Sequence, residues 1–243
     1  MTDPATTTVA VPQALDRPGG ADVRRAARLT AGAAAAAAAL LLLFPVLRPW
    51  PDESVPSLEL AAAFASGRWV VAHLCGIAGL AILAPTFLGL RALLRSRGAR
   101  GVRAATAAAA TAWSGAGMCA LYFGAEIFGI RVLAKAALRT GDLAKLSDVD
   151  VLRNQPAALT LFGVGLALLA AAGVLAAAAL WQSGVRPRWS GVPLAAGLVL
   201  YLPQFFGTAA LRVAHGALVA GGLLLLAWAA TRLPRTRTAG LPD

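Results

Sequence analysis

Residues 29–47, LTAGAAAAAAALLLLFPVL, form a run of 19 residues without a charge. A helix of about 20 apolar residues is long enough to cross the ~30 Å hydrocarbon core of a bilayer. The arginines before this run resemble the basic start of a secretory signal. However, the run is longer than the apolar part of a signal, and it leads into Arg48-Pro-Trp-Pro rather than a small-residue cleavage site. The segment therefore predicts an uncleaved first transmembrane helix.

The composition of the whole chain points the same way. Of the 243 residues, 58% are hydrophobic and 14% are charged, and the mean hydropathy is +0.70. Soluble domains are about 45–50% apolar and about 25% charged, so we exclude a soluble enzyme and a secreted disulfide-stabilised domain. The formal net charge is +11. Because the basic residues flank apolar runs, they indicate membrane orientation, and we expect no nucleic-acid partner.

Further apolar segments predict an all-α membrane protein with a bundle of six transmembrane helices. The expected spans are residues 29–47, 69–90, 104–130, 156–181, 187–206 and 209–231. We expect the chain to reverse between the last two spans at Gln204-Phe-Phe-Gly-Thr208, where Gly207 is able to adopt a positive φ. The transmembrane domain then covers residues 28–231. Residues 1–27 are expected to form a disordered tail, and residues 232–243 a second tail.

A polar connection, residues 131–155, separates the third and fourth expected spans. Its pattern predicts a short amphipathic helix at the membrane surface. The sequence Ser147-Asp-Val-Asp150 is typical of a capped helix start. Pro156 suits the first position of the fourth span, because a helix does not use the N–H of that position.

The distribution of basic residues predicts that both termini are cytoplasmic. With the N-terminus inside, the inner segments carry 14 Lys and Arg residues and the outer segments carry 8. Cytoplasmic loops carry the excess of basic residues in membrane proteins, so we expect residues 49–67 and 132–154 outside. The preference for Arg over Lys and the abundance of Ala are typical of a high-GC bacterial genome. These features predict a location in the bacterial cytoplasmic membrane.

Polar residues within the expected spans are the candidate binding residues. They are His73, Tyr122, Glu126, Arg212 and His215. In the predicted topology all of them lie in the outer leaflet, although they come from three different helices. Ionisable groups are costly in hydrocarbon, and their presence there suggests a function. We expect Glu126 to pair with Arg131 or Arg212. His73 and His215 share the pattern Val-Ala-His with a glycine six residues later.

Three kinds of function are compatible with this cluster. The first is binding or transport of an ion, a lipid headgroup or a small solute. The second is a haem-binding electron carrier that uses His73 and His215 as axial ligands. The third is a structural subunit, in contact with a membrane protein partner or a second copy of the chain, in which these residues only hold helices together.

Known catalytic and metal-binding patterns do not occur in the sequence. It contains no HExxH, GxSxG or phosphate-binding Walker motif, and no cluster of His and Cys. Cys75 and Cys119 lie in apolar runs and do not form a CxxC motif, so we interpret them as packing residues. The sequence therefore predicts no enzyme, no metal site and, apart from the haem alternative, no cofactor.

Two segments carry a resemblance to a known group of proteins. Residues 66–100, SGRWVVAHLCGIAGLAILAPTFLGLRALLRSRGAR, join a Trp-x-x-Ala-His helix to an arginine-rich loop. Residues 185–200, VRPRWSGVPLAAGLVL, place a basic turn before a helix that contains proline. Both segments resemble a loose group of uncharacterised six-helix integral membrane proteins from high-GC bacteria. The resemblance implies a six-helix membrane fold and implies no activity.

Overall fold

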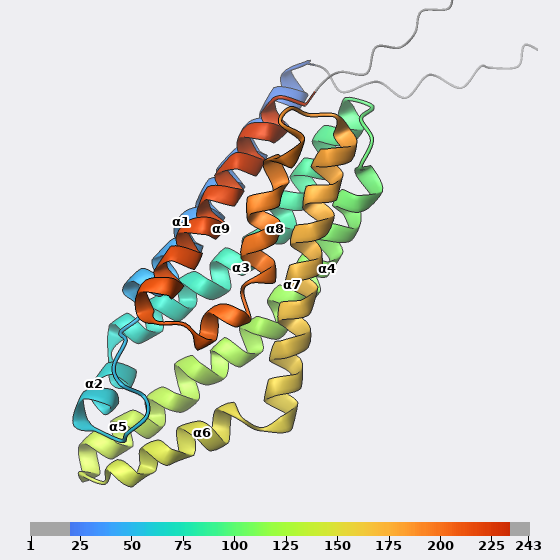
Figure 1. Cartoon of the computed structure of the whole chain (residues 1–243). Helices are drawn as coiled ribbons and strands as arrows, with labels where there is room; N and C mark the ends of the chain where they lie inside the picture. The colour runs from blue at the N-terminus through green and yellow to red at the C-terminus, as the bar shows by residue number, and fades with distance from the viewer. Residues whose placement is uncertain (1–19, 234–243) are drawn as a thin grey trace, which may run out of the picture.

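The computed structural model describes residues 20–233, which form helices joined by turns and contain no β-strand (Figure 1). The α-helices are α1 (Gly20–Leu47), α2 (Leu58–Ala65), α3 (Gly67–Ser96), α4 (Val102–Ala125), α5 (Arg131–Thr140), α6 (Asp148–Arg153), α7 (Pro156–Ser183), α8 (Val192–Val199) and α9 (Ala209–Thr231). The shorter turns are the π-helix η1 (Glu126–Ile130) and the 3₁₀ helices η2 (Leu143–Ser147), η3 (Arg188–Gly191) and η4 (Pro203–Phe206).

Within the described residues, 5 helices are long and apolar enough to cross a membrane. They are Gly20–Leu47, Gly67–Ser96, Val102–Thr140, Pro156–Ser183 and Ala209–Thr231. This finding indicates a multi-pass membrane protein. The expected span at residues 187–206 is not among them, because that segment is the short helix α8 between two 3₁₀ helices. Pro203 has no N–H to continue the hydrogen bonds of an α-helix.

The long helices form a closed ring. In chain order α1 contacts α3, α3 contacts α4, α4 contacts α7, α7 contacts α8, α8 contacts α9, and α9 returns to α1. The main apolar core lies inside this ring and consists largely of Ala and Leu, with Phe44, Phe87 and Phe123. Glycines bring some of the helices into close contact, and α4 and α7 approach closely at Gly115 and Gly165.

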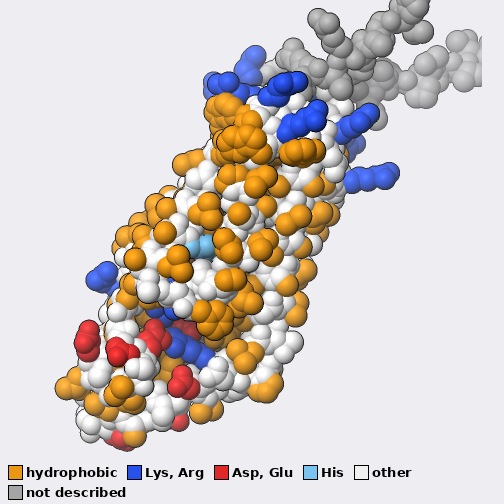
Figure 2. All heavy atoms as spheres, in the orientation of Figure 1, with side chains coloured by type: hydrophobic (Ala, Val, Ile, Leu, Met, Phe, Trp, Pro, Cys, Tyr) orange, Lys and Arg blue, Asp and Glu red, His pale blue; other side chains and the backbone are white. Residues whose placement is uncertain are grey.

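The two ends of the bundle differ in charge. Figure 1 shows that α1 begins and α9 ends at the same end of the molecule, where the turns after α3 and α7 also lie. Figure 2 shows that Lys and Arg side chains gather at this end, whereas Asp and Glu gather at the opposite end. The segments that we expected inside therefore share one end, and residues 49–67 and 132–154 share the other.

A small helical layer extends beyond the acidic end of the bundle. The helix that begins at Val102 does not end with the expected third span but continues through η1 and α5 to Thr140, a length of 39 residues. At 1.5 Å per residue it measures about 58 Å, nearly twice the ~30 Å hydrocarbon core. The amphipathic helix expected at the membrane surface is therefore α5, which continues the line of α4.

The apolar face of α5 packs on α2 rather than on the membrane surface. The two helices share a second apolar cluster with η2 and α6, built around Phe64, Trp69 and Ile130. We call α2, α5, η2 and α6 the cap.

Several local predictions have clear outcomes. Pro156 is the first residue of α7, as predicted. Ser147 precedes α6, but its hydroxyl donates to the carbonyl of Ala144 and does not cap the helix. The chain turns at residues 204–208 as expected, whereas the positive φ expected for Gly207 is wrong: its φ is −91°. The side chain of Thr208 makes the turn by capping α9.

The expected tails are only partly described. α1 already begins at Gly20, so residues 20–27 are helical and the predicted disorder is wrong there. Residues 1–19 and 234–243 lie outside the described residues. α9 ends at Thr231, where the second tail was expected to begin.

The contact between α4 and α7 provides a test of this packing. A Cβ added at Gly115 would lie 2.7 Å from the carbonyl oxygen of Gly165, so the two backbones would have to separate. We expect Gly115→Ala to lower the free energy of unfolding by about 1–3 kcal/mol, measured by thermal unfolding in detergent. Gly117→Ala is the matched control, because its Cβ would meet nothing within 4 Å. Equal stability of the two variants would contradict the close contact.

Candidate functional site

A cavity of about 700 Å³ lies where the bundle meets the cap. Its walls come from α1, α3, α4, α7 and α9, from the loop after α1, from the end of α6 and from the turn after α8. The volume is within the range of about 300–1,000 Å³ that is usual for small-molecule sites. All five residues predicted from the sequence line this cavity, namely His73, Tyr122, Glu126, Arg212 and His215.

Glu126 is buried at the start of η1, with 6% of its surface exposed. Arg153, at the end of α6, donates from Nε to Oε1 at 2.6 Å and from Nη2 to Oε2 at 3.0 Å. Bidentate pairs of this kind are among the strongest hydrogen bonds in proteins, because both groups are charged. The pair joins the long helix of the bundle to the last helix of the cap.

The partners predicted for this carboxylate are wrong. Arg131 instead donates from Nε to the carbonyl of Ala65 at 3.3 Å. Arg212 donates to the carbonyls of Gly207 and Phe205. Arg131 was predicted because it is close to Glu126 in sequence, and Arg212 because it was expected at a similar depth in the membrane. Arg153, which occupies the place instead, is 27 residues away in sequence.

The ion pair belongs to a longer network. Glu53, in the loop after α1, contacts Arg48 at 2.8 Å and Arg153 at 2.6 Å. Burial alone would raise the pKa of the Glu53 carboxyl, but Arg48 and Arg153 outweigh it and hold this pKa below its usual value. Burial would lower the pKa of Arg153, but Glu126 and Glu53 raise it above the usual value. Glu53 and Arg153 are therefore both charged at neutral pH.

His73 lies between this network and the aromatic interior. Its Nδ1 is 2.7 Å from the carbonyl oxygen of Trp69, and its Nε2 is 3.6 Å from Oε2 of Glu126. A carbonyl only accepts hydrogen bonds, so Nδ1 carries the hydrogen of this contact and Nε2 faces the carboxylate. The rings of Phe44 and Phe123 stand edge-on to the imidazole at 5.4 Å and 5.7 Å.

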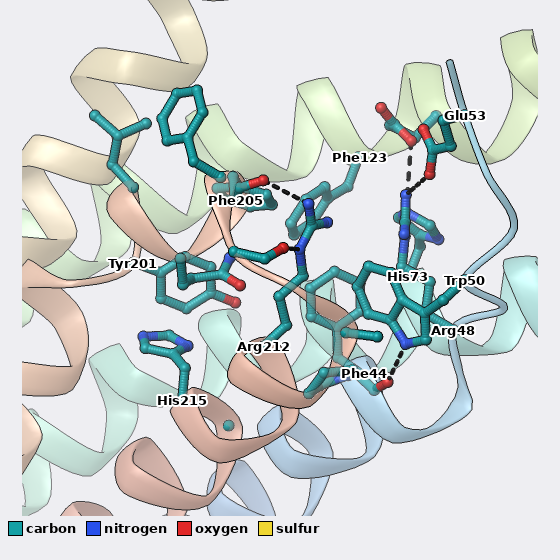
Figure 3. A pocket seen from close by; sticks show the side chains of 18 of the residues that line it. Phe44, Arg48, Trp50, Glu53, His73, Phe123, Tyr201, Phe205, Arg212 and His215 are labelled. Atoms are coloured by element: carbon teal, nitrogen blue, oxygen red, sulfur yellow. Dashed lines mark hydrogen bonds and ion pairs between the residues drawn. The ribbon is translucent and has the colours of Figure 1, made fainter. Parts of the chain in front are cut away.

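His215 lies on another wall of the cavity. Its Nε2 is 2.7 Å from the carbonyl oxygen of Gly197, which ties α9 to α8. Its ring meets the ring of Tyr201 at 5.1 Å, and Figure 3 shows it beside Tyr201 and away from His73. Each histidine thus has one nitrogen engaged with a backbone carbonyl, and the other nitrogen of His73 faces a carboxylate. This geometry gives no support to the two histidines as ligands of one haem.

The remaining predicted residue, Tyr122, takes no part in the ion pairs. Its ring stacks on Phe162 of α7 with a centroid distance of 4.2 Å. Phe162 in turn contacts the rings of Phe123 and Phe205. Tyr122 therefore belongs to an aromatic floor beneath the charged part of the cavity.

Four cavity residues escaped the sequence reasoning because they lie in segments expected to be loops. They are Arg48, Trp50, Glu53 and Arg153. The sequence did contain an indication of Arg153: a buried carboxylate at Glu126 requires a basic side chain as its partner. Trp50 was not recognised, although its ring lies close to two guanidinium groups, 4.2 Å from that of Arg48 and 4.7 Å from that of Arg212.

Residues 20–233 contain neither a metal-binding cluster nor a disulfide. These residues contain no group of three or more His, Cys, Asp or Glu side chains that could hold a metal ion. Cys75 and Cys119 are both free thiols, and Cys119 is buried in the core. Comparison of the chain with protein-family models, with curated proteins and with solved structures gives no match. The functional argument therefore depends on the geometry of the cavity.

The ion pair between Glu126 and Arg153 allows a direct test. We expect Glu126→Ala to destabilise the protein more than Glu126→Gln, because the amide still accepts a hydrogen bond from Arg153. Arg153→Ala should cost about 3–5 kcal/mol, since it leaves a buried carboxylate without its cation. The measurement is thermal unfolding in detergent, with Arg131→Ala as the control for loss of an arginine at the same end. Additive effects of Glu126→Gln and Arg153→Ala would show that the two side chains do not interact.

Proposed function

We propose that the protein is a binding or transport bundle of the bacterial cytoplasmic membrane, and that an ion, a lipid headgroup or a small solute occupies the cavity. The observation that carries this proposal is the cavity itself. Its volume of about 700 Å³ suits a small molecule. Its lining combines a charged network with an aromatic floor, and both features come from helices far apart in the chain. A few placed polar groups on a largely apolar wall are typical of ligand sites.

The backbone after α8 supports the same proposal. Residues 200–207 leave the α-helical form and line the cavity. Irregular backbone at membrane depth is tolerated where it is enclosed by protein or lines a cavity, and broken helices form the substrate sites of many transporters. In the proposed topology α8 and its flanking turns make the sixth, broken crossing. With both termini cytoplasmic, the cavity lies in the outer half of the membrane.

This topology has a simple test. We expect a reporter fused after Lys145 in the cap to be active only outside the cytoplasm. A reporter fused at the C-terminus should be active inside. The reason is the excess of basic residues at the end of the bundle opposite the cap. A cytoplasmic signal from position 145 would reverse the orientation and place the cavity in the inner half of the membrane.

A purely structural role is the main competing interpretation. The bond from His215 to Gly197 and the pair of Glu126 with Arg153 do hold elements together. Such contacts stabilise the protein whether or not a ligand binds. The two interpretations differ in whether a molecule enters the cavity, so the discriminating measurement is the accessibility of the cavity wall.

Thiol labelling measures that accessibility. We expect Phe205→Cys, in a protein with Cys75 and Cys119 replaced by Ala, to react with a charged maleimide in phosphatidylcholine vesicles. In vesicles of a total bacterial lipid extract the reaction should slow about tenfold, the protection given by a ligand at about ten times its Kd. Val151→Cys is the control, because Val151 is exposed on α6 and does not line the cavity. Equal slowing at both positions, or at neither, would contradict occupancy.

A further inference from the structure

We infer that the ligand of this cavity is an amphiphile with an oxyanion head, a phosphate or a carboxylate, held between Arg48 and Arg212 with its apolar chain on the aromatic floor. This inference rests on the proposed function and names the ligand class. It is argued from the acids that are already engaged, the donors that are left over, the aromatic floor and the character of the opening.

The acids of the cavity lining all have partners. Asp52 is exposed at the rim and accepts hydrogen bonds from the backbone and the hydroxyl of Ser54. Glu53 and Glu126 are engaged with Arg48, Arg153 and His73, as described above. Arg212 therefore has no carboxylate partner among the described residues. Its guanidinium is bound to two backbone carbonyls and lies against the ring of Trp50, and none of these groups carries a negative charge.

Arg48 retains an unused donor beside the same space. Its side chain is only 7% exposed, and its Nη2 donates to Glu53. Its Nη1 is fully buried and has no hydrogen-bond partner in the described part of the chain. A buried donor without an acceptor is unfavourable, and more so when it belongs to a charged group. Because Nη1 has no solvent-accessible surface, an anionic oxygen from the cavity would satisfy it after a small shift of the Arg48 side chain.

Trp50 lies close to both arginines. Its indole lies 4.2 Å from the guanidinium of Arg48 and 4.7 Å from that of Arg212, and its Nε1 donates to the carbonyl of Pro45 at 3.0 Å. Figure 3 shows Arg212 and Arg48 on the same side of the cavity with Trp50 beside them. The two guanidinium groups repel each other, and the Glu53 carboxylate beside Arg48 offsets only part of this repulsion because Arg153 shares it. Their planar donor pairs match the oxygens of a phosphate or a carboxylate.

The start of α9 strengthens the same preference. Arg212 lies in the first turn of α9, and Gly207 and Ala209 at this helix end also line the cavity. The N-terminus of a helix carries a partial positive charge and favours an anion. The partial positive charge of the helix end thus adds to the charge of Arg212, which has no carboxylate bound to it.

The floor of the cavity suits a hydrocarbon chain and not a second polar group. It is formed by side chains of three helices and the turn after α8, namely Phe44, Tyr122, Phe123, Phe162, Tyr201 and Phe205. Apolar side chains of the lining also face outwards: Leu159, Leu202 and Phe206 are exposed, Phe206 by 88%. In a membrane these side chains meet lipid. A ligand that passes them comes from the bilayer, which favours an amphiphile over a free anion.

Binding of hexadecyl phosphate is the first measurement. Purified protein in nanodiscs of phosphatidylcholine is titrated with hexadecyl phosphate, hexadecanol and inorganic phosphate, and binding is followed by calorimetry. We expect hexadecyl phosphate to bind at least about tenfold more tightly than hexadecanol, about the difference that one charge-assisted hydrogen bond makes. We expect inorganic phosphate at millimolar concentration not to compete. This comparison uses the wild-type protein and is independent of any folding defect in a variant.

Variants then locate the site. Arg212→Gln should weaken binding of hexadecyl phosphate about tenfold and leave that of hexadecanol unchanged, whereas Arg212→Lys should have a smaller effect. Arg131→Gln is the matched control, because Arg131 lies at the same end of the molecule and also donates to a backbone carbonyl, but does not line the cavity. Equal weakening by Arg131→Gln would overturn the assignment of the head group to Arg212.

The other outcomes separate this inference from the proposed function. Equal binding of hexadecanol and hexadecyl phosphate would overturn the oxyanion head and leave a cavity that binds neutral amphiphiles. Full competition by inorganic phosphate would overturn the amphiphile and leave an anion site. Absence of binding by all three probes, together with an unprotected Phe205→Cys, would overturn both proposals.

Discussion

The ion pair between Glu126 and Arg153 is the constraint on which the architecture of the cap end of the molecule depends. A carboxylate buried in an apolar bundle is tolerated only with a cation and a complete set of hydrogen bonds. The long helix does not supply that cation from its own sequence neighbours. It continues as α5, turns back through η2, and α6 delivers Arg153 to the carboxylate. The cap thus provides the counter-charge of the bundle, and its apolar cluster around Phe64 and Trp69 holds α6 where Arg153 is needed.

The cavity follows from the same arrangement. The network runs from Arg48 through Glu53 and Arg153 to Glu126, so it ties the end of α1 and the end of α6 to the long helix. α8 is too short to fill the opposite wall, and the turn after it leaves space above the aromatic floor. The ion-pair network therefore also forms one wall of the cavity. Arg212 lines the same cavity but does not belong to the network. The charges that stabilise the fold therefore differ from the charge that is left for a ligand.

Much of the fold could be predicted because long apolar runs in a sequence identify the helices that are able to span a membrane. The apolar runs located the long helices, Pro156 marked the start of α7, and depth in the spans selected five residues that line one cavity. Depth says nothing about direction around a helix or about loops. It therefore paired Glu126 with Arg131 or Arg212 and missed Arg153, whose position depends on the folding of the cap. The break after α8 was also not predicted, because residues 187–206 were expected to form one continuous span.

The π-helix η1 gives the long helix two faces that a regular helix would not have. A π-helical turn contains one residue more than an α-helical turn, and each residue rotates an α-helix by about 100°. Glu126 can therefore face inward to the cavity, while Ile130 and Ala134, farther along, face α2. Deletion of a single residue between them would leave the helix unbroken but would rotate α5 by about a quarter of a circle relative to α4. The apolar face of α5 would then miss α2, so the spacing of this short stretch sets the alignment of the two layers.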